Sequence, residues 1–398
     1  MDRIETVRRD LVGTPIHLCP ERAYLVTDFY KNHADPSEPI TVRKARALAY
    51  VLQNKSVEIF PGELVVGNAG SSRKSCIMQP ELATSFMSQE LLWINRRKTN
   101  PFKSKLRDRV KLLTRVIPYW LLHSMPSRMF PGPVRFASYV KHQLKPTYYL
   151  INEAGGIGHF LPDYEKMLRL GTSGYLETFK EKKGDIYDAA RIACGALEDW
   201  AGRFADRAGS LAHAEVDPER KSELLEISRI CRKVPRYPAE TLHEALQSLW
   251  LTHLAVNLES LNSAVSFGRI DQYLYPYYQR DIDEGLLTRE EALELLLLFS
   301  AKATEHVFLL NEMISQYHGG YLVVQAAIVG GTDREGRDAV NQLTYLFLDV
   351  MEKHRMRDPN YQARVHSGSP DEYLERALEV AREGYGVPSL FNDGAVVP

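Results

Sequence analysis

The sequence predicts an α/β protein in which buried strands are surrounded by many helices. Residues 321–331 form a continuous apolar run closed by two glycines, which is typical of a central strand. Helix-start signals lie on either side of it, because residues 288–291 read Thr-Arg-Glu-Glu and residues 369–372 read Ser-Pro-Asp-Glu. The chain has 398 residues, of which 44% are hydrophobic and 25% charged, as in ordinary globular proteins. Buried strands among many helices indicate a single large α/β body.

The first half of the chain predicts helices separated by loops rich in glycine, proline and aromatic residues. Residues 59–68 (IFPGELVVGN) predict a turn followed by a short buried strand. Residues 126–161 hold many prolines, glycines and aromatic side chains and predict a packed loop, with a short strand at 147–151. Helices are expected over residues 42–55, 80–95 and 104–125.

Helix signals are stronger in the second half. Residues 239–259 are mostly apolar and predict a helix buried on several sides. The capping box at Thr288 opens a helix to about Glu305, and the one at Ser369 opens a helix to about Arg382, with Pro370 at the first helical position. Residues 338–354 repeat apolar side chains at helical spacing. We see no internal repeat or linker, so residues 1–398 are expected to form one domain.

Charge and motif content exclude several classes of protein. With 50 basic and 51 acidic residues, the chain has no net field that would attract nucleic acid or an anionic membrane. The longest apolar run, residues 295–299, is too short to span a bilayer, and the N-terminus lacks a signal-peptide core, so we expect a cytoplasmic protein. Four scattered cysteines predict reduced thiols, without a disulfide framework or a metal site.

Residues 152–165 form the first segment that could carry chemistry. Glycines at 155, 156 and 158 bring backbone close to a neighbour, and His159 follows them just before an expected helix. A histidine there could transfer a proton or bind a substrate oxygen. The alternative is a structural histidine, whose ring is satisfied by a backbone carbonyl in a tight loop.

Residues 259–278 form the second segment. Asn262 and Ser263 could line a pocket. Arg269 and Asp271 lie two residues apart, and a structural ion pair near the core is the favoured interpretation, since buried charges are usually paired.

The apolar run at residues 321–331 is the third segment. In a strand, Tyr321 and Gln325 would project to the same side and could form a small polar site in an apolar wall. Outward-facing packing is the alternative.

Six short sequence motifs, taken together, resemble those of the glycyl radical enzyme family, the pyruvate formate-lyase and glycerol dehydratase group. They occur in the family's order and extend over nearly the whole chain. They are residues 13–23 (GTPIHLCPERA), 61–68 (PGELVVGN), 158–165 (GHFLPDYE), 266–276 (SFGRIDQYLYP), 330–341 (GGTDREGRDAVN) and 386–393 (GVPSLFND).

The resemblance implies the first half of a ten-stranded barrel, wrapped by helices. In the family, a glycyl radical is installed by a radical-SAM activating enzyme and generates a thiyl radical on a cysteine, which attacks a small organic substrate in a closed cavity. None of the four cysteines stands in the family's context. The resemblance therefore implies that the catalytic Cys and the radical Gly lie beyond Pro398, and that this chain acts within a homodimer when full length, or with a complementing C-terminal chain.

The resemblance also implies substrate-binding residues. His159 matches a substrate-contacting histidine, and Tyr321 falls where a pocket tyrosine falls, whereas Ser263 and Ala264 replace a His-Ser pair that grips hydroxyl groups in glycerol dehydratase. That departure argues against glycerol and favours a less polar ligand, as in arylacetate decarboxylases or fumarate-adding synthases. A non-catalytic half-barrel that binds a ligand or another subunit is the alternative reading of the whole chain.

Overall fold

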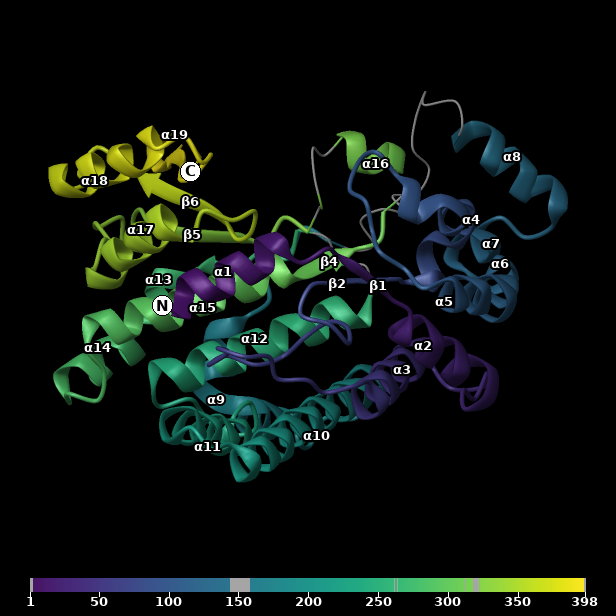
Figure 1. Ribbon diagram of the computed structural model, residues 1–398, viewed down its shortest axis with the longest axis horizontal. Helices are drawn as coiled ribbons and strands as arrows, with labels where there is room; N and C mark the ends of the chain where they lie inside the picture. The colour runs from purple at the N-terminus through teal and green to yellow at the C-terminus, as the bar shows by residue number, and fades with distance from the viewer. Residues whose placement is uncertain are drawn as a thin grey trace.

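The computed structural model describes residues 3–143, 158–260, 262, 264–310, 312–317, 321 and 323–396. Its strands form two parallel sheets, one in the order β1-β2-β4 and the other in the order β3-β5-β6-β7 (Figure 1). We call them the three-stranded and the four-stranded sheet. The strands are β1 (His17–Cys19), β2 (Ser75–Ile77), β3 (Gly268–Arg269), β4 (His306–Phe308), β5 (Ala326–Gly330), β6 (Asn360–Val365) and β7 (Ser389–Asn392).

Helices make up most of the rest of the described chain, and the long helices α9 to α12 lie along one side of the strands (Figure 1). The helices are α1 (Arg3–Gly13), α2 (Glu21–Asn32), α3 (Ile40–Asn54), α4 (Pro80–Trp93), α5 (Leu106–Lys111), α6 (Ile117–His123), α7 (Met125–Met129), α8 (Pro133–Gln143), α9 (Tyr164–Glu177), α10 (Asp185–Ala214), α11 (Pro218–Lys233), α12 (Leu242–Glu259), α13 (Ile270–Tyr273), α14 (Tyr275–Asp283), α15 (Arg289–Glu305), α16 (Glu312–Tyr317), α17 (Gln342–His354), α18 (Asp371–Arg382) and α19 (Asp393–Val396). A 3₁₀ turn (Ile94–Arg96) and a π-helical turn (Leu112–Val116) continue α4 and α5. The predicted α/β class is confirmed.

Helix α12 is the centre of the core. Of its 18 residues, 15 are buried, as its mostly apolar sequence predicts. Helix α15 packs beside it and contributes a second buried stretch around Leu296 and Phe299. These two helices position the segments that precede β4 and β5.

Residues 59–68 do not form the predicted strand. They are irregular, although Val65 and Val66 are buried. Their backbone is satisfied by α12 side chains instead of by a neighbouring strand. The Gln247 amide exchanges two hydrogen bonds with the Val66 N–H and C=O (2.8 Å each), and Trp250 Nε1 donates to the Gly67 carbonyl (2.9 Å). A buried segment needs its backbone groups paired, but a sheet is only one way to pair them.

Residues 126–143 also differ from the prediction of a packed loop, because they form parts of α7 and α8. Pro133 is the first residue of α8, a position where proline favours a helix instead of breaking it. The strand expected at 147–151 lies outside the described residues.

The two helix-start signals have different outcomes. Thr288 caps α15 in a complete capping box with Glu291, as predicted. Helix α18 is present, but Pro370 is its N-cap residue and no side chain caps it. The Ser369 hydroxyl instead accepts a hydrogen bond from the His366 N–H (2.9 Å), which closes the turn before the helix.

A buried ion cluster fixes the loop at residues 59–68 to α15. The Lys302 ammonium contacts Glu63, and it lies 2.5 Å from Glu305. Asn68 donates to the same Glu305 carboxyl (3.2 Å). Burial, together with the neighbouring Glu63 carboxylate, raises the pKa of Glu305 to about 7, and the Lys302 ammonium and the buried Arg73 guanidinium offset part of this effect. Glu305 is therefore partly protonated near neutral pH, which reduces the repulsion between the two carboxyl groups.

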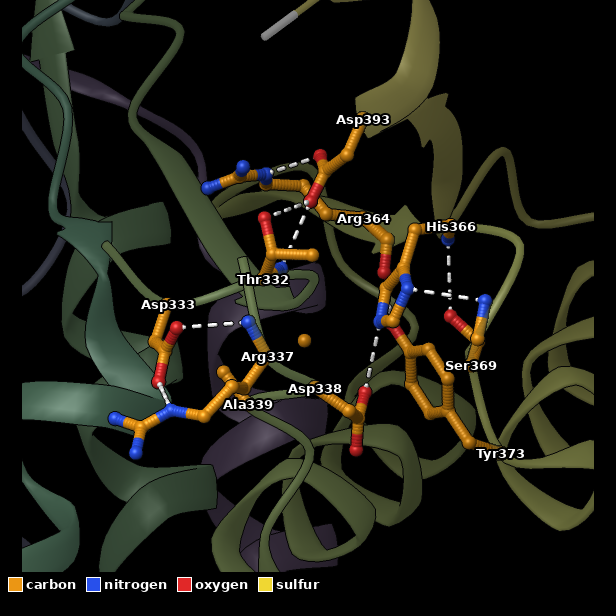
Figure 2. A network of polar contacts seen from close by, with 12 residues as sticks. Thr332, Asp333, Arg337, Asp338, Ala339, Arg364, His366, Ser369, Tyr373 and Asp393 are labelled. Carbon is orange, nitrogen blue, oxygen red and sulfur yellow. Dashed lines mark hydrogen bonds and ion pairs between the residues drawn. The ribbon is translucent and has the colours of Figure 1, made fainter. Parts of the chain in front are cut away.

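Polar side chains also join the carboxyl ends of β5, β6 and β7 (Figure 2). Asp393, which follows β7, accepts from Arg364 Nε on β6 (2.6 Å) and from the Thr332 N–H after β5 (2.8 Å). The Tyr373 hydroxyl of α18 donates to the Arg364 carbonyl (3.0 Å), and His366 lies 3.0 Å from Asp338. Every strand end in this network is therefore tied to a neighbour.

Arg269 and Asp271 bind the same glycine instead of each other. Arg269 donates to the Gly330 carbonyl (2.7 Å), and Asp271 accepts from the Gly330 N–H (2.8 Å) and from Thr344 (2.6 Å). Both residues have the structural role that the sequence favoured. The prediction of a direct ion pair between them is wrong, because Asp271 lies in α13 and not on the strand with Arg269.

None of the helices in the described part of the chain has both the length and the apolar character that crossing a bilayer requires.

Glu305→Gln should flatten the dependence of stability on pH. A glutamate titrates near pH 4.3 in an unfolded chain and Glu305 near pH 7 in the fold, so the folded state binds the extra proton and loses stability as pH rises through that window. Urea unfolding midpoints at pH 5 and pH 8 should therefore differ less in Glu305→Gln than in the unmodified chain. The exposed Glu290→Gln is the control, and an unchanged pH dependence in both variants would contradict the assignment.

Gly330→Ala should destabilise the fold more than Gly336→Ala. Both glycines have positive φ, +70° and +77°, so both substitutions strain the backbone. A Cβ at Gly330 would also run into the Tyr373 hydroxyl, whereas one at Gly336 would meet nothing within 4 Å. We expect losses of about 3 kcal/mol or more against about 1 kcal/mol in urea unfolding. Equal losses would show that the contact with Tyr373 is easily relieved.

Candidate functional site

Three non-glycine residues with left-handed backbone converge just before β3 and β5. They are His159 (φ +58°), Ala264 (φ +57°) and Val324 (φ +56°). The Ala264 N–H donates to the Val323 carbonyl (2.8 Å), and the Ser266 N–H donates to the Phe160 carbonyl (3.1 Å), so the three segments lie side by side. We call this group the strained cluster.

The strain in this cluster points to a site. A β-branched residue such as Val324 rarely adopts positive φ, and such strain tends to collect at active sites and ligand clamps. The side chain of Val324 is also 40% exposed, so its conformation is not imposed by close packing of an apolar side chain. The polar network at the opposite end of the same sheet differs, because its charges are paired with one another (Figure 2).

His159 carries the free imidazole of the strained cluster. Its side chain is exposed, and we find no polar partner for it among the described residues. The ring can therefore accept or donate a hydrogen bond to a ligand. Ser263 lies outside the described residues, and Ala264 presents only a methyl group beside it in the sequence.

Gln325 lies in a buried chain of hydrogen bonds and does not face solvent. Its Oε1 lies 2.8 Å from His253 Nε2, its Nε2 donates to the Ala303 carbonyl (2.8 Å), and His253 Nδ1 lies 2.7 Å from the Tyr164 hydroxyl. Burial lowers the pKa of His253 to about 4. Tyr164 is the first residue of α9, which follows the segment of His159, and Gln325 follows Val324. This series of hydrogen bonds therefore connects two segments of the strained cluster through the buried core.

Tyr321 belongs to a different part of the core. Its hydroxyl donates to the Pro101 carbonyl (2.9 Å), and its ring packs edge-on against Phe102, with centroids 5.5 Å apart. Strand β5 begins only at Ala326, so the alternation expected to place Tyr321 and Gln325 on one strand face does not exist. The structure brings His159 and Ala264 together but does not bring Tyr321 to the same hydrogen-bonded group.

The four cysteines are all buried, and they lie on β1, β2, α10 and α11. Burial raises the thiol pKa of Cys76 well above its usual value, and that of Cys194 to about 11 and of Cys231 to about 12. None of them belongs to a segment of the strained cluster. Thiols held protonated in this way are poor nucleophiles and metal ligands.

Sequence reasoning missed Val324, His253 and Tyr164. The positive φ of Val324 leaves no mark on its residue type, so no pattern could have found it. The signal for His253 was present, because it is a polar residue inside the mostly apolar run 239–259, where a buried side chain needs a partner.

Comparison with known proteins gives matches along the whole chain. The family model described as pyruvate formate lyase-like matches residues 1–398. Isethionate sulfite-lyase of Nitratidesulfovibrio vulgaris is 32% identical over 100% of this chain and 50% of its own length. Trans-4-hydroxy-L-proline dehydratase of Clostridioides difficile is 29% identical over 100% of this chain and 52% of its own length.

Solved structures agree with these matches. A glycyl radical enzyme from Archaeoglobus fulgidus superposes with a TM-score of 0.92 and 34% identity, over 99% of this chain and 52% of that chain. The B12-independent glycerol dehydratase from Clostridium butyricum superposes with a TM-score of 0.91 and 29% identity, over 100% of this chain and 51% of that chain. The chain thus spans about half the length of the relatives it matches. Its fold corresponds to half of a glycyl radical enzyme barrel, and the chain belongs to the pyruvate formate lyase-like family of glycyl radical enzymes.

Proposed function

We propose that residues 1–398 form the N-terminal portion, as one domain, of a glycyl radical enzyme that uses a thiyl radical to cleave or form C–C or C–O bonds. The observation that carries the proposal is that the chain aligns along its whole length with half of several lyases and dehydratases and superposes on half of a glycyl radical enzyme. The strained cluster of His159, Ala264 and Val324, which precedes β3 and β5, is where we place the substrate. The catalytic Cys and the radical Gly would come from outside residues 1–398.

His159 is the residue that we assign to the substrate. An exposed imidazole that bonds to none of the described residues can hold a substrate hydroxyl and transfer a proton as that group leaves. Ser263 and Ala264 would form the less polar side of the same pocket. Gln325 would support the pocket from the buried core, through its hydrogen bond with His253. Tyr321 would join this pocket only by releasing the Pro101 carbonyl, to which its hydroxyl is bonded in this structure.

The substrate class that we propose is a small hydroxylated molecule that undergoes elimination. The relatives matched over the whole chain include a sulfite-lyase and a dehydratase. The 4-hydroxyphenylacetate decarboxylase glycyl radical subunit of Clostridioides difficile matches 72% of the chain at 27% identity. We therefore favour elimination over the decarboxylation of arylacetates that the loss of the His-Ser pair first indicated.

The proposed partners are a radical-SAM activating enzyme, a second copy of the complete enzyme and a complementing C-terminal polypeptide, in the cytoplasm of an anaerobe. An open sheet edge supports the last of these. Among the described strands, β7 pairs only with β6, and its Leu390 and Phe391 side chains are 45% and 40% exposed. An apolar edge of this kind invites pairing with another strand. The same edge would serve the alternative, a non-catalytic half-barrel that binds another subunit.

The chain alone should not acquire a glycyl radical. Residues 1–398 would be incubated under anoxia with a radical-SAM activating enzyme of the family and S-adenosylmethionine, and examined by electron paramagnetic resonance. We expect no glycyl doublet, because no glycine of this chain stands in the family's radical context. A full-length family member with its activating enzyme is the positive control. A doublet from residues 1–398 alone would refute the assignment.

His159→Ala should impair turnover in the complete enzyme without affecting radical formation. Loss of a positioned acid–base group typically lowers the rate by about 100-fold or more. The glycyl signal should keep its normal intensity, because His159 acts on the substrate. His213→Ala, at an exposed position in the last turn of α10, is the control and should keep normal turnover. Unchanged kcat/KM in His159→Ala would remove His159 from the site.

A further inference from the structure

A groove separate from the strained cluster lies between α3, α9, α10 and α12. Its volume is about 410 Å³, within the range of small-molecule sites. Apolar side chains form most of its walls, among them Leu48, Met167, Leu197 and Val256. Phe160 and Asn262, each next in sequence to a residue of the expected substrate pocket, line it as well.

Two buried polar atoms in this groove lack a partner in the described structure. Asn262 is 2% exposed, and its Nδ2 donates to the Val256 carbonyl (2.8 Å) and to Glu259 (3.3 Å), which leaves Oδ1 as a free acceptor. Thr252 is 9% exposed, and its hydroxyl has no hydrogen bond. Leaving such an atom unsatisfied costs about 1–3 kcal/mol, so each one needs an explanation.

The two unpaired atoms come from different segments. Thr252 lies within α12, whereas Asn262 lies beyond the end of that helix and is bonded through its Nδ2 to the Val256 carbonyl, one helical turn after Thr252. A ligand that fills the groove and bonds both atoms needs a polar group for each, with an apolar body between them that matches the apolar walls.

The charge of the groove limits the ligand further. Glu259 is the charged residue among the lining side chains, and Lys44, outside the lining, neutralises it at 2.5 Å. No lysine, arginine or histidine is among the residues that line the groove in the described structure. A carboxylate ligand would therefore be buried with no cationic side chain among the described lining residues to pair with it.

We propose that this groove binds a small neutral molecule with an apolar, ring-sized body and a hydrogen-bonding group at each end. One group donates to Asn262 Oδ1 and the other pairs with the Thr252 hydroxyl. The site is separate from the proposed radical chemistry, and its test uses residues 1–398 alone, so either proposal can fail without the other.

Methionine methyl groups labelled with ¹³C report binding, because Met167 lines the groove. Met167→Leu identifies its signal. The probe is 4-(2-hydroxyethyl)phenol, compared with 2-phenylethanol and 4-ethylphenol, which each lack one polar group. We expect the probe to shift the Met167 signal with a dissociation constant about fivefold lower than either, the effect of one net hydrogen bond. The anion 4-hydroxyphenylacetate, which has the same skeleton, should bind at least about tenfold more weakly than the probe, because it lacks a counter-charge.

Variants separate this site from nonspecific association. Thr252→Val keeps the side-chain shape, and it should remove the advantage of the probe over the compound that lacks the matching group. Ala193→Phe should fill the groove and abolish the shifts, whereas Ala190→Phe, one turn away on α10 and not a lining residue, should not. An unmoved Met167 signal, or ethylbenzene binding as tightly as the probe, would overturn the proposal and leave a groove filled by water.

Discussion

Helix α12 provides hydrogen bonds that no neighbouring strand supplies, both to the irregular segment before β2 and to the residue that precedes β5. Its Gln247 and Trp250 satisfy the irregular segment around Val66 and Gly67, and its His253 reaches Gln325 at the start of β5. A helix buried on most of its surface would ordinarily be apolar throughout. Here Gln247, Trp250 and His253 each bond a backbone or side-chain partner, which is the condition under which burial of a polar group is tolerated, whereas the Thr252 hydroxyl has no partner in the described structure.

The strained cluster is held in place by these contacts. A left-handed valine survives only where its surroundings determine its conformation. Val323 accepts from Ala264 before the strained residue, and Gln325 is bound to His253, Ala303 and Asp358 after it. Hydrogen bonds of the residues on both sides of Val324 therefore offset the free-energy cost of its strained backbone. The polar network at the carboxyl ends of β5, β6 and β7 keeps these strands aligned. The strained cluster lies at the opposite, amino ends of the sheet.

The elements that could be predicted from the sequence are those whose signals are local. Helix α17 follows from apolar periodicity, α12 from its mostly apolar run and α15 from its capping box, because those patterns lie within the helix itself. The strand expected at residues 59–68 failed because the partners of Val66 lie 181 residues away, on a helix. The start of β5 was misplaced for a similar reason, since the backbone of Val324 is set by contacts with distant segments. In the site, His159 and Ala264 came from resemblance to a family, while residue type alone left His159 open to a structural reading.

The buried hydrogen bonds that run from Tyr164 through His253 and Gln325 to Ala303 all have the same donor-to-acceptor direction. Gln325 Nε2 is committed to the Ala303 carbonyl, so its Oε1 must accept the proton of His253 Nε2, and His253 Nδ1 must accept the proton of Tyr164. The series ends on a carbonyl in the last turn of α15, where helices have acceptors to spare. Bonds aligned in this way polarise and strengthen one another. Because the pKa of His253 is lowered to about 4, none of these groups changes its protonation near neutral pH. The direction of the hydrogen bonds that support the segment carrying His159 is therefore constant over this pH range.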